Sequence, residues 1–276
     1  MNAFSSLVVL QNPQREEFAD ALGILQDHSH VEIVSQLSEG KISSGENLSP
    51  DFILLCQEHP NEFSKNEIES WRQELPLARW AILYGSWCEG ELRTGHPPEG
   101  ISRWPWYEGK PRLEMIFQGW QRNQITELDR PVTETPLEKS LLYQSFQYRN
   151  FGDWAILHDQ GVQNNWLVAC CRQEKISAIS FANKDSQDFE TWLKSRATPP
   201  GILWDTDRFD ERSFERLKDW LSLTTEQRLI VLSHFPRWQD RERIRDFPNA
   251  SLLGKPFALD LLFHCMSRPV YSNPIS

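Results

Sequence analysis

Several features that mark common protein classes are scarce in this sequence. Long hydrophobic runs are missing, because the longest apolar stretches, such as residues 52–56 and 229–232, fall far short of the roughly 20 residues that cross a bilayer. We therefore expect no membrane span. The N-terminal region has no basic segment, and its apolar stretch at 7–10 is too short for the core of a signal peptide. These absences predict a cytoplasmic protein.

Cysteine and positive charge are also in short supply. The cysteines, an odd number without CxxC spacing, do not suit a zinc cluster or a disulfide framework. They are Cys56, Cys88, Cys170, Cys171 and Cys265. The chain has 29 Lys and Arg against 39 Asp and Glu, a formal net charge of −10. Because that balance repels a polyanion, nucleic-acid binding is excluded as the main activity.

A glycine-rich phosphate loop is absent where a nucleotide-binding fold would need one. Residues 11–14, which follow the first apolar run, contain no Gly, Ser or Thr. Backbone N–H groups at such a loop normally hold a phosphate. A flavodoxin-like protein that binds a nucleotide or flavin is therefore the least favoured alternative.

Short apolar runs alternating with amphipathic segments fill the second half of the chain. With 276 residues and 39% hydrophobic content, the chain is long enough for two small domains. Strands are predicted at 154–157, 176–182, 201–205, 229–233 and 250–253. Helices are predicted at 164–173, 186–195, 213–221, 238–245 and 258–266. Alternation of this kind predicts an α/β fold, a doubly wound parallel sheet with helices on both faces.

The first half repeats this pattern less completely. Strands are predicted at 7–10, 31–35, 52–56, 80–84 and 102–106, with helices at 15–25 and 64–74. Residues 38–50 and 87–98 are rich in Gly, Ser and Pro and are expected to be loops. Prolines at 111, 131 and 136 indicate a connector with short helical pieces. We therefore predict domains at 1–110 and 152–276, joined by a connector at 111–151.

The two halves match at a constant spacing of 149 residues. This spacing pairs Ile53 with Ile202, Trp71 with Trp220, and Arg79 with Arg228, among others. The matches fall in the third strand, the helix that follows it and the fourth strand of each half. They predict a diverged tandem duplication.

Polar residues gather at predicted strand ends in the second half. Asp205, Ser233 and Lys255 follow the third, fourth and fifth strands, and Asp159 follows the first. In an open α/β sheet the ligand site lies outside the carboxyl ends of the strands. An aspartate, a hydroxyl and an ammonium converging there suit phosphoryl chemistry.

Three segments, PPGILWD, RLIVLSH and LLGKPF, resemble the receiver domains of two-component systems over about residues 153–266. The resemblance implies flavodoxin-like sheets in the order 2-1-3-4-5. It implies that Asp205 is a phosphoryl acceptor, that Ser233 and Lys255 contact the phosphoryl oxygens, and that Asp159 and Asp205 bind Mg²⁺. The spacings of 28 and 22 residues between these positions are similar to those of the family.

The sequence departs from the receiver pattern in both halves. The first strand of the second half ends in His158 and Asp159 where the family has two acids, so Mg²⁺ binding should be weak. In the first half, Cys56, Tyr84 and Trp106 occupy the acceptor, hydroxyl and lysine positions. The first half should be a degenerate pseudo-receiver with an apolar, aromatic pocket. For the aromatic side chains at 104, 106 and 107 two alternatives stay open: core packing, which is the simplest explanation of the many Trp residues, or an exposed surface that contacts a partner or binds a flat ligand.

The resemblance implies a signal-transduction protein of tandem receiver-like domains rather than an enzyme. About ten residues remain beyond 266, too few for an output domain, so signalling would proceed through protein contact. A histidine kinase or a phosphotransfer protein is an expected partner. The alternative is a scaffold that acts without phosphorylation.

Overall fold

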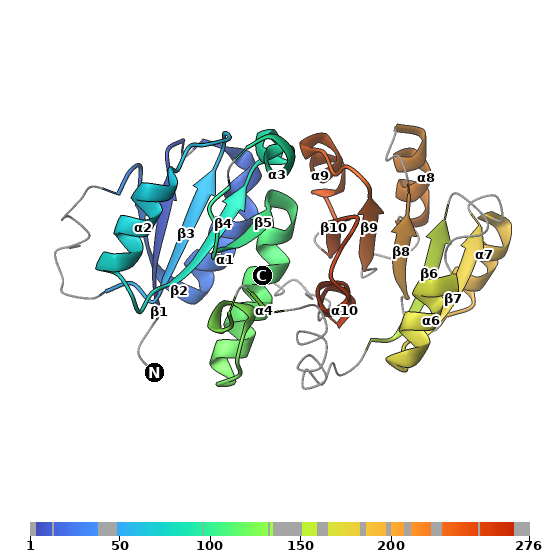
Figure 1. Ribbon diagram of the computed structural model, residues 1–276. Helices are drawn as coiled ribbons and strands as arrows, with labels where there is room; N and C mark the ends of the chain where they lie inside the picture. The colour runs from blue at the N-terminus through green and yellow to red at the C-terminus, as the bar shows by residue number, and fades with distance from the viewer. Residues whose placement is uncertain are drawn as a thin grey trace, which may run out of the picture. The chain divides into compact units, whose positions relative to one another are not determined.

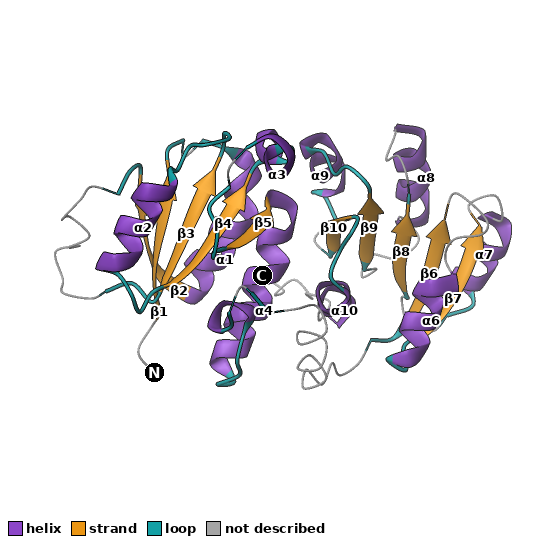
Figure 2. Ribbon diagram, in the orientation of Figure 1, coloured by secondary structure: helices purple, strands orange, loops and turns teal. Residues whose placement is uncertain are grey.

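The computed structural model describes residues 4–12, 14–37, 49–95, 97–131, 133–134, 151–158, 165–182, 186–196, 200–206, 211–221, 228–247 and 249–267. The chain divides into two compact units, Met1–Gln144 and Ser145–Ser276, called unit 1 and unit 2 below. Each contains one five-stranded sheet with helices on both faces (Figure 1, Figure 2).

The sheet of unit 1 is parallel throughout and has the order β2-β1-β3-β4-β5. Its strands are β1 Phe4–Leu10, β2 Ser29–Val34, β3 Phe52–Gln57, β4 Arg79–Tyr84 and β5 Ser102–Pro105. Every residue of β3 is buried. A central strand covered on both faces is a continuous apolar run, which is why the sequence pattern identified it.

Helices of unit 1 are α1 Ala19–His28, α2 Lys65–Glu74, α3 Glu91–Thr94 and α4 Gly109–Gln121. Helix α2 begins with a capping box, in which the Ser64 side chain accepts from the Glu67 N–H and the Glu67 carboxylate accepts from the Ser64 N–H. Its apolar stripe, with Ile68 and Trp71, packs on one face of the sheet beside Ile53. Helix α1 contacts α4.

Helix α4 corrects one prediction. Short helical pieces were expected after residue 107, whereas α4 runs for 13 residues and is largely buried. Pro111, which suggested an interruption, lies in the first turn, where a proline N–H is not needed. Gly109 lets the helix approach the sheet, because a Cβ there would lie 2.8 Å from Leu83 Cδ1 and 3.1 Å from Ala21 Cβ.

Unit 2 has the sheet order β10-β9-β8-β6-β7, which is the same 2-1-3-4-5 arrangement read from the other edge. Its strands are β6 Asp153–His158, β7 Ser177–Ala182, β8 Gly201–Asp205, β9 Leu229–Ser233 and β10 Ala250–Gly254. Its helices are α6 Asn165–Gln173, α7 Ser186–Lys194, α8 Glu211–Leu221, α9 Trp238–Ile244 and α10 Leu259–Ser267. Both sheets therefore have the predicted flavodoxin-like topology.

The pairing of strands repeats at the spacing of 149 residues. Cys56 pairs with Leu83 and Tyr84 with Pro105 in unit 1, as Asp205 pairs with Leu232 and Ser233 with Gly254 in unit 2. Positions that match in sequence are thus equivalent in the sheets.

Some predictions concern parts of the chain that are not described. Asp159 and most of the loop predicted at 38–50 lie outside the described residues. Within the described ranges, every helix is too short or too polar to traverse a bilayer.

Candidate functional site

The structure brings Asp205, Ser233 and Lys255 to one edge of unit 2. Asp205 ends β8, Ser233 ends β9, and Lys255 directly follows β10. These three strands are neighbours in the sheet and run parallel, so their carboxyl ends meet. This edge is the candidate functional site.

An ion pair joins two of these residues. Lys255 Nζ donates a hydrogen bond to Asp205 Oδ1, and both side chains are mostly buried, with exposed fractions of 16% and 15%. The Lys255 backbone N–H donates to the Ser233 carbonyl at 2.7 Å, and the peptide bond between Lys255 and Pro256 is cis. On the other side, the Thr206 N–H donates to the Leu232 carbonyl at 3.0 Å. The backbone thus positions both charged side chains at the edge.

The neighbour of Asp205 on β6 is an imidazole. His158 is the register partner of Asp205 and is 9% exposed. Asp159, the second carboxylate expected here, is not among the described residues. In the described part of the chain, no group of three or more His, Cys, Asp or Glu side chains is arranged to hold a metal. The described residues therefore do not form a complete Mg²⁺ site, and a role for Mg²⁺ stays a prediction.

The equivalent positions of unit 1 hold different side chains. Cys56 is fully buried, and burial, aided by the nearby Glu62 carboxylate, strongly raises the pKa of its thiol. Burial and the neighbouring Glu108 raise the pKa of Tyr84 to about 12. Trp106 is 4% exposed. These three side chains are a neutral thiol, a neutral phenol and an indole.

The carboxyl edge of unit 1 is nevertheless charged, which corrects the prediction of an apolar pocket. Glu91, at the start of α3, forms an ion pair with Arg103 of β5. Gln57, the last residue of β3, donates from Nε2 to Glu91 Oε1 and Oε2 at 3.0 and 3.2 Å. Arg103 also donates to Gln57 Oε1 at 3.2 Å. A buried polar network occupies the edge.

Of the two alternatives for the aromatic segment, the structure favours core packing for its two tryptophans. Trp104 and Trp106 are 2% and 4% exposed, so they belong to the core of unit 1. The Arg112 guanidinium lies over the Trp104 ring, 5.9 Å from its centroid. Burial raises the pKa of Tyr107 well above its usual value. Clustered aromatic residues in the sequence did not reveal which side of the chain they face.

A second polar group lies beside this network. Glu17 is buried; its Oε1 accepts from Ser86 Oγ at 2.6 Å, and its Oε2 lies 3.4 Å from Arg15 Nε. Arg15 also pairs with Glu58, at 3.3 Å. Gly85 makes room for this arrangement, because a Cβ there would lie 2.7 Å from Glu17 Oε2. Sequence reasoning missed these residues, since they come from separate segments with no spacing pattern.

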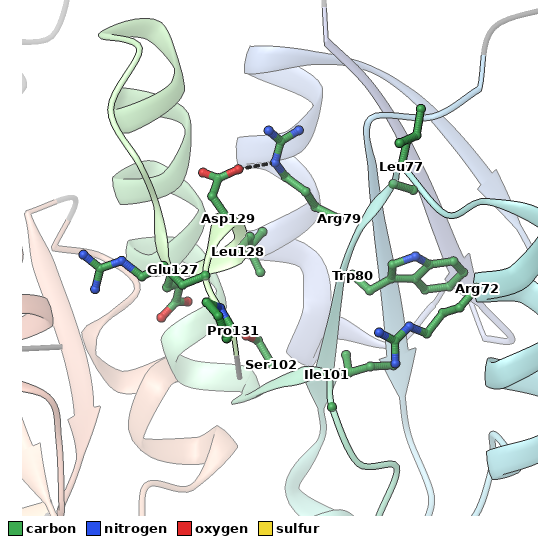
Figure 3. A pocket seen from close by; sticks show the side chains of 13 residues that line it. Arg72, Leu77, Arg79, Trp80, Ile101, Ser102, Glu127, Leu128, Asp129 and Pro131 are labelled. Atoms are coloured by element: carbon green, nitrogen blue, oxygen red, sulfur yellow. Dashed lines mark hydrogen bonds and ion pairs between the residues drawn. The ribbon is translucent and has the colours of Figure 1, made fainter. Parts of the chain in front are cut away.

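A pocket of about 410 Å³ opens at the opposite end of the unit 1 sheet (Figure 3). It is lined by residues at the amino ends of β4 and β5, including Trp80 and Ile101, and by the segment 127–131. Arg79 Nε donates to Asp129 Oδ1 at 2.5 Å across one side of it (Figure 3). This pocket is remote from the carboxyl ends where the sequence predicted a ligand.

Comparison with known proteins does not assign a family. No protein-family model matches the sequence, and no curated protein matches it either. The chain has low similarity to the solved C-terminal region of E. coli RcsC, with its linker and phosphoreceiver domain (10% identity, 94% of this chain and 89% of that chain, TM-score 0.34).

Two other solved structures show the same low level of similarity. One is a probable two-component system response regulator/GGDEF domain protein (12% identity, 94% of both chains, TM-score 0.32). The other is the C-terminal domain of glucosamine-fructose-6-phosphate aminotransferase from Francisella tularensis (12% identity, 95% and 81%, TM-score 0.29). The assignment of the fold depends on the observed sheet order.

Proposed function

We propose that this protein is a cytoplasmic signal-transduction protein of two receiver-like domains that acts through protein contact, with Asp205 as a phosphoryl acceptor. The observation that carries the proposal is the Asp205–Lys255 ion pair at the meeting point of β8, β9 and β10. A carboxylate beside a fixed ammonium combines a nucleophile with a cation that neutralises charge on transferring oxygens.

The proposed reaction is transfer of a phosphoryl group from an acyl phosphate or a phosphohistidine. A carboxylate oxygen of Asp205 attacks phosphorus, and the bond from phosphorus to the donor oxygen or nitrogen breaks, with the electron pair leaving on the donor. The Lys255 ammonium then exchanges its contact with the carboxylate for one with the phosphoryl oxygens. The hydrogen bond from the Lys255 backbone N–H to the Ser233 carbonyl holds the backbone of this residue beside the end of β9 while its side chain changes partner.

The test is phosphorylation of the full chain with acetyl phosphate over a series of Mg²⁺ concentrations, followed by intact-protein mass spectrometry. We expect wild type to gain one phosphoryl group and Asp205→Asn to gain none. Asp153→Asn is the matched control, because Asp153 starts the adjacent strand β6 and pairs with Arg196 at 2.7 Å, away from the carboxyl edge. Uptake by Asp205→Asn, or no uptake by wild type at any Mg²⁺ concentration, would overturn the proposal.

One observation favours a second candidate, a scaffold that works without phosphorylation. The neighbour of Asp205 on β6 is His158 rather than a carboxylate, so the described residues supply one acid to a cation. A histidine kinase or phosphotransfer partner belongs to the first proposal only. Capture of a partner with equal affinity by wild type and Asp205→Asn would support the scaffold.

A further inference from the structure

The Glu91 carboxylate in unit 1 is held as a bound anion would be. It receives two contacts from Gln57 Nε2, a hydrogen bond from the Asn61 N–H at 3.0 Å, and the ion pair with Arg103. Its side chain is 1% exposed. An amide, a backbone N–H and a guanidinium on one carboxylate form the donor set that recognises oxyanions.

These donors belong to the sheet and to the loop that follows β3. The carboxylate belongs to neither of these segments. Glu91 is the first residue of the four-residue helix α3, which follows Gly90 and precedes Gly95. In unit 2, by contrast, Asp205 is part of the sheet strand itself. The anion of unit 1 is therefore a tethered group on a separate short segment.

Space for the carboxylate arm depends on Gly95. A Cβ at this position would lie 2.6 Å from Glu91 Cγ. Gly95 has φ −110°, which any residue adopts, so space rather than backbone conformation explains the glycine. Arg103 keeps further donor capacity, since its buried Nε makes no hydrogen bond. Its guanidinium is held over the Tyr84 ring, 5.1 Å from the centroid.

We propose that the carboxyl edge of unit 1 is an oxyanion-binding site that the chain fills with its own Glu91, and that removal of this carboxylate opens the site to small carboxylates. While Glu91 is in place, its high effective concentration excludes anions from solution. The oxyanion-binding site of unit 1 then stays occupied by Glu91 whatever anions are in solution. The proposal goes beyond phosphorylation of Asp205 and uses residues of unit 1 only, so either proposal can fail without the other.

The experiment is rescue of Glu91→Ala by acetate, because this substitution deletes the atoms of one acetate ion. Thermal unfolding of the full chain is followed at neutral pH in sodium acetate and in sodium chloride of equal ionic strength. We expect acetate to raise the Tm of Glu91→Ala by about 2–5 °C at ~0.2 M, as mass action requires for a weakly bound ligand. Wild type should show no difference between the two salts.

Two variants make the result specific. Glu91→Ala combined with Arg103→Met lacks the cation and should lose the response to acetate. Glu91→Gln fills the same space and should also give none. An equal response in wild type or in the double variant would overturn the proposal, as would a folded Glu91→Ala that does not respond. If Glu91→Ala folds only poorly, its refolding yield in acetate and in chloride is measured instead. Equal yields in the two salts would overturn the proposal.

Discussion

The two sheets place their bulk on different strands at equivalent positions. In unit 1, the small Ser6 of β1 pairs with Phe52 of β3, whereas in unit 2 the large Trp154 of β6 pairs with Gly201 of β8. All of these positions are buried. The large side chain of the pair is on the third strand of the sheet in unit 1 and on the first strand in unit 2. The comparison teaches that the fold constrains the combined volume of neighbouring side chains more than the residue at each position.

The charged side chains at the carboxyl edge also occupy different positions in the two units. Unit 2 pairs Asp205 and Lys255, both at strand ends, while unit 1 pairs Glu91 of α3 with Arg103 from within β5. Each edge therefore has a contact between a carboxylate and a cation. The position of the acid differs: it is on a strand of the sheet in unit 2 and on a separate short helix in unit 1.

Arg79, the first residue of β4, and Arg228, the residue just before β9, differ in their partners. Arg79 lies over the Trp120 ring and Arg228 over the Trp154 ring, each 5.0 Å from the centroid. Arg79 pairs with the Asp129 carboxylate, whereas Arg228 donates to the backbone carbonyls of Phe151 and Met266. The Asp129 carboxylate can be protonated at low pH, whereas the two backbone carbonyls cannot.

The largest expected effect on stability comes from placing the acid of unit 2 at the equivalent position of unit 1. Cys56→Asp places a carboxyl group where Cys56 has no exposed surface and Glu62 adds repulsion. We expect unit 1 to lose about 3 kcal/mol or more of stability, because a buried charge without a cation is costly. Calorimetric unfolding measures the loss. Cys56→Ala, the control, should cost only about 1–2 kcal/mol, and a Cys56→Asp variant as stable as wild type would show that the two edges are interchangeable.

Filling the space at Gly201 should have the next largest effect. An alanine Cβ there would lie 2.5 Å from two carbons of the Trp154 ring. The ring is fixed by the hydrogen bond from its Nε1 to the Phe151 carbonyl, at 2.9 Å, and by Arg228 above it. We expect Gly201→Ala to destabilise unit 2 by about 2–3 kcal/mol in urea unfolding.

The matched control for Gly201→Ala is Gly23→Ala. A Cβ at Gly23, in helix α1, meets nothing within 4 Å. This substitution should stabilise unit 1 by about 0.5–1 kcal/mol, because alanine favours helix more than glycine does. Equal effects of the two substitutions would contradict the exchange of bulk between strands.

The smallest expected effect is a difference in pH dependence between the two arginines. Burial alone would raise the pKa of Asp129, but hydrogen bonds from Thr126 and the pairing with Arg79 outweigh it and lower that pKa. A lowered carboxyl pKa gives stability that is complete above the unfolded pKa of about 4 and is lost as the pH falls through the folded value.

Arg79→Met should therefore cost less stability at pH ~2.5 than at pH ~7. The difference should be under about 1 kcal/mol, because Arg79 is partly exposed and solvent screens the pair. Arg228→Met should show a smaller difference between the two pH values, since the backbone carbonyls of Phe151 and Met266 do not titrate in this range. Urea unfolding at the two pH values measures both. A parallel pH dependence for the two variants would contradict the difference in partners.

Much of the scaffold was predictable because it depends on local pattern. The strands 201–205 and 229–233 were predicted with the observed bounds, since a buried parallel strand is a short continuous apolar run. Helix α4 was missed, because Pro111 and Gly109 suggest an interruption unless their place in the first turn and against the sheet is known.

The amino-acid sequence was sufficient to predict two doubly wound sheets, their matching positions, and the convergence of Asp205, Ser233 and Lys255, because strand order and direction place strand ends together. Only the tertiary structure revealed that Glu91 reaches Gln57 and Arg103. Such contacts join segments that are distant in sequence and carry no periodicity. The hydrophobic pattern determines which faces are buried, but only packing decides which polar groups meet at an edge.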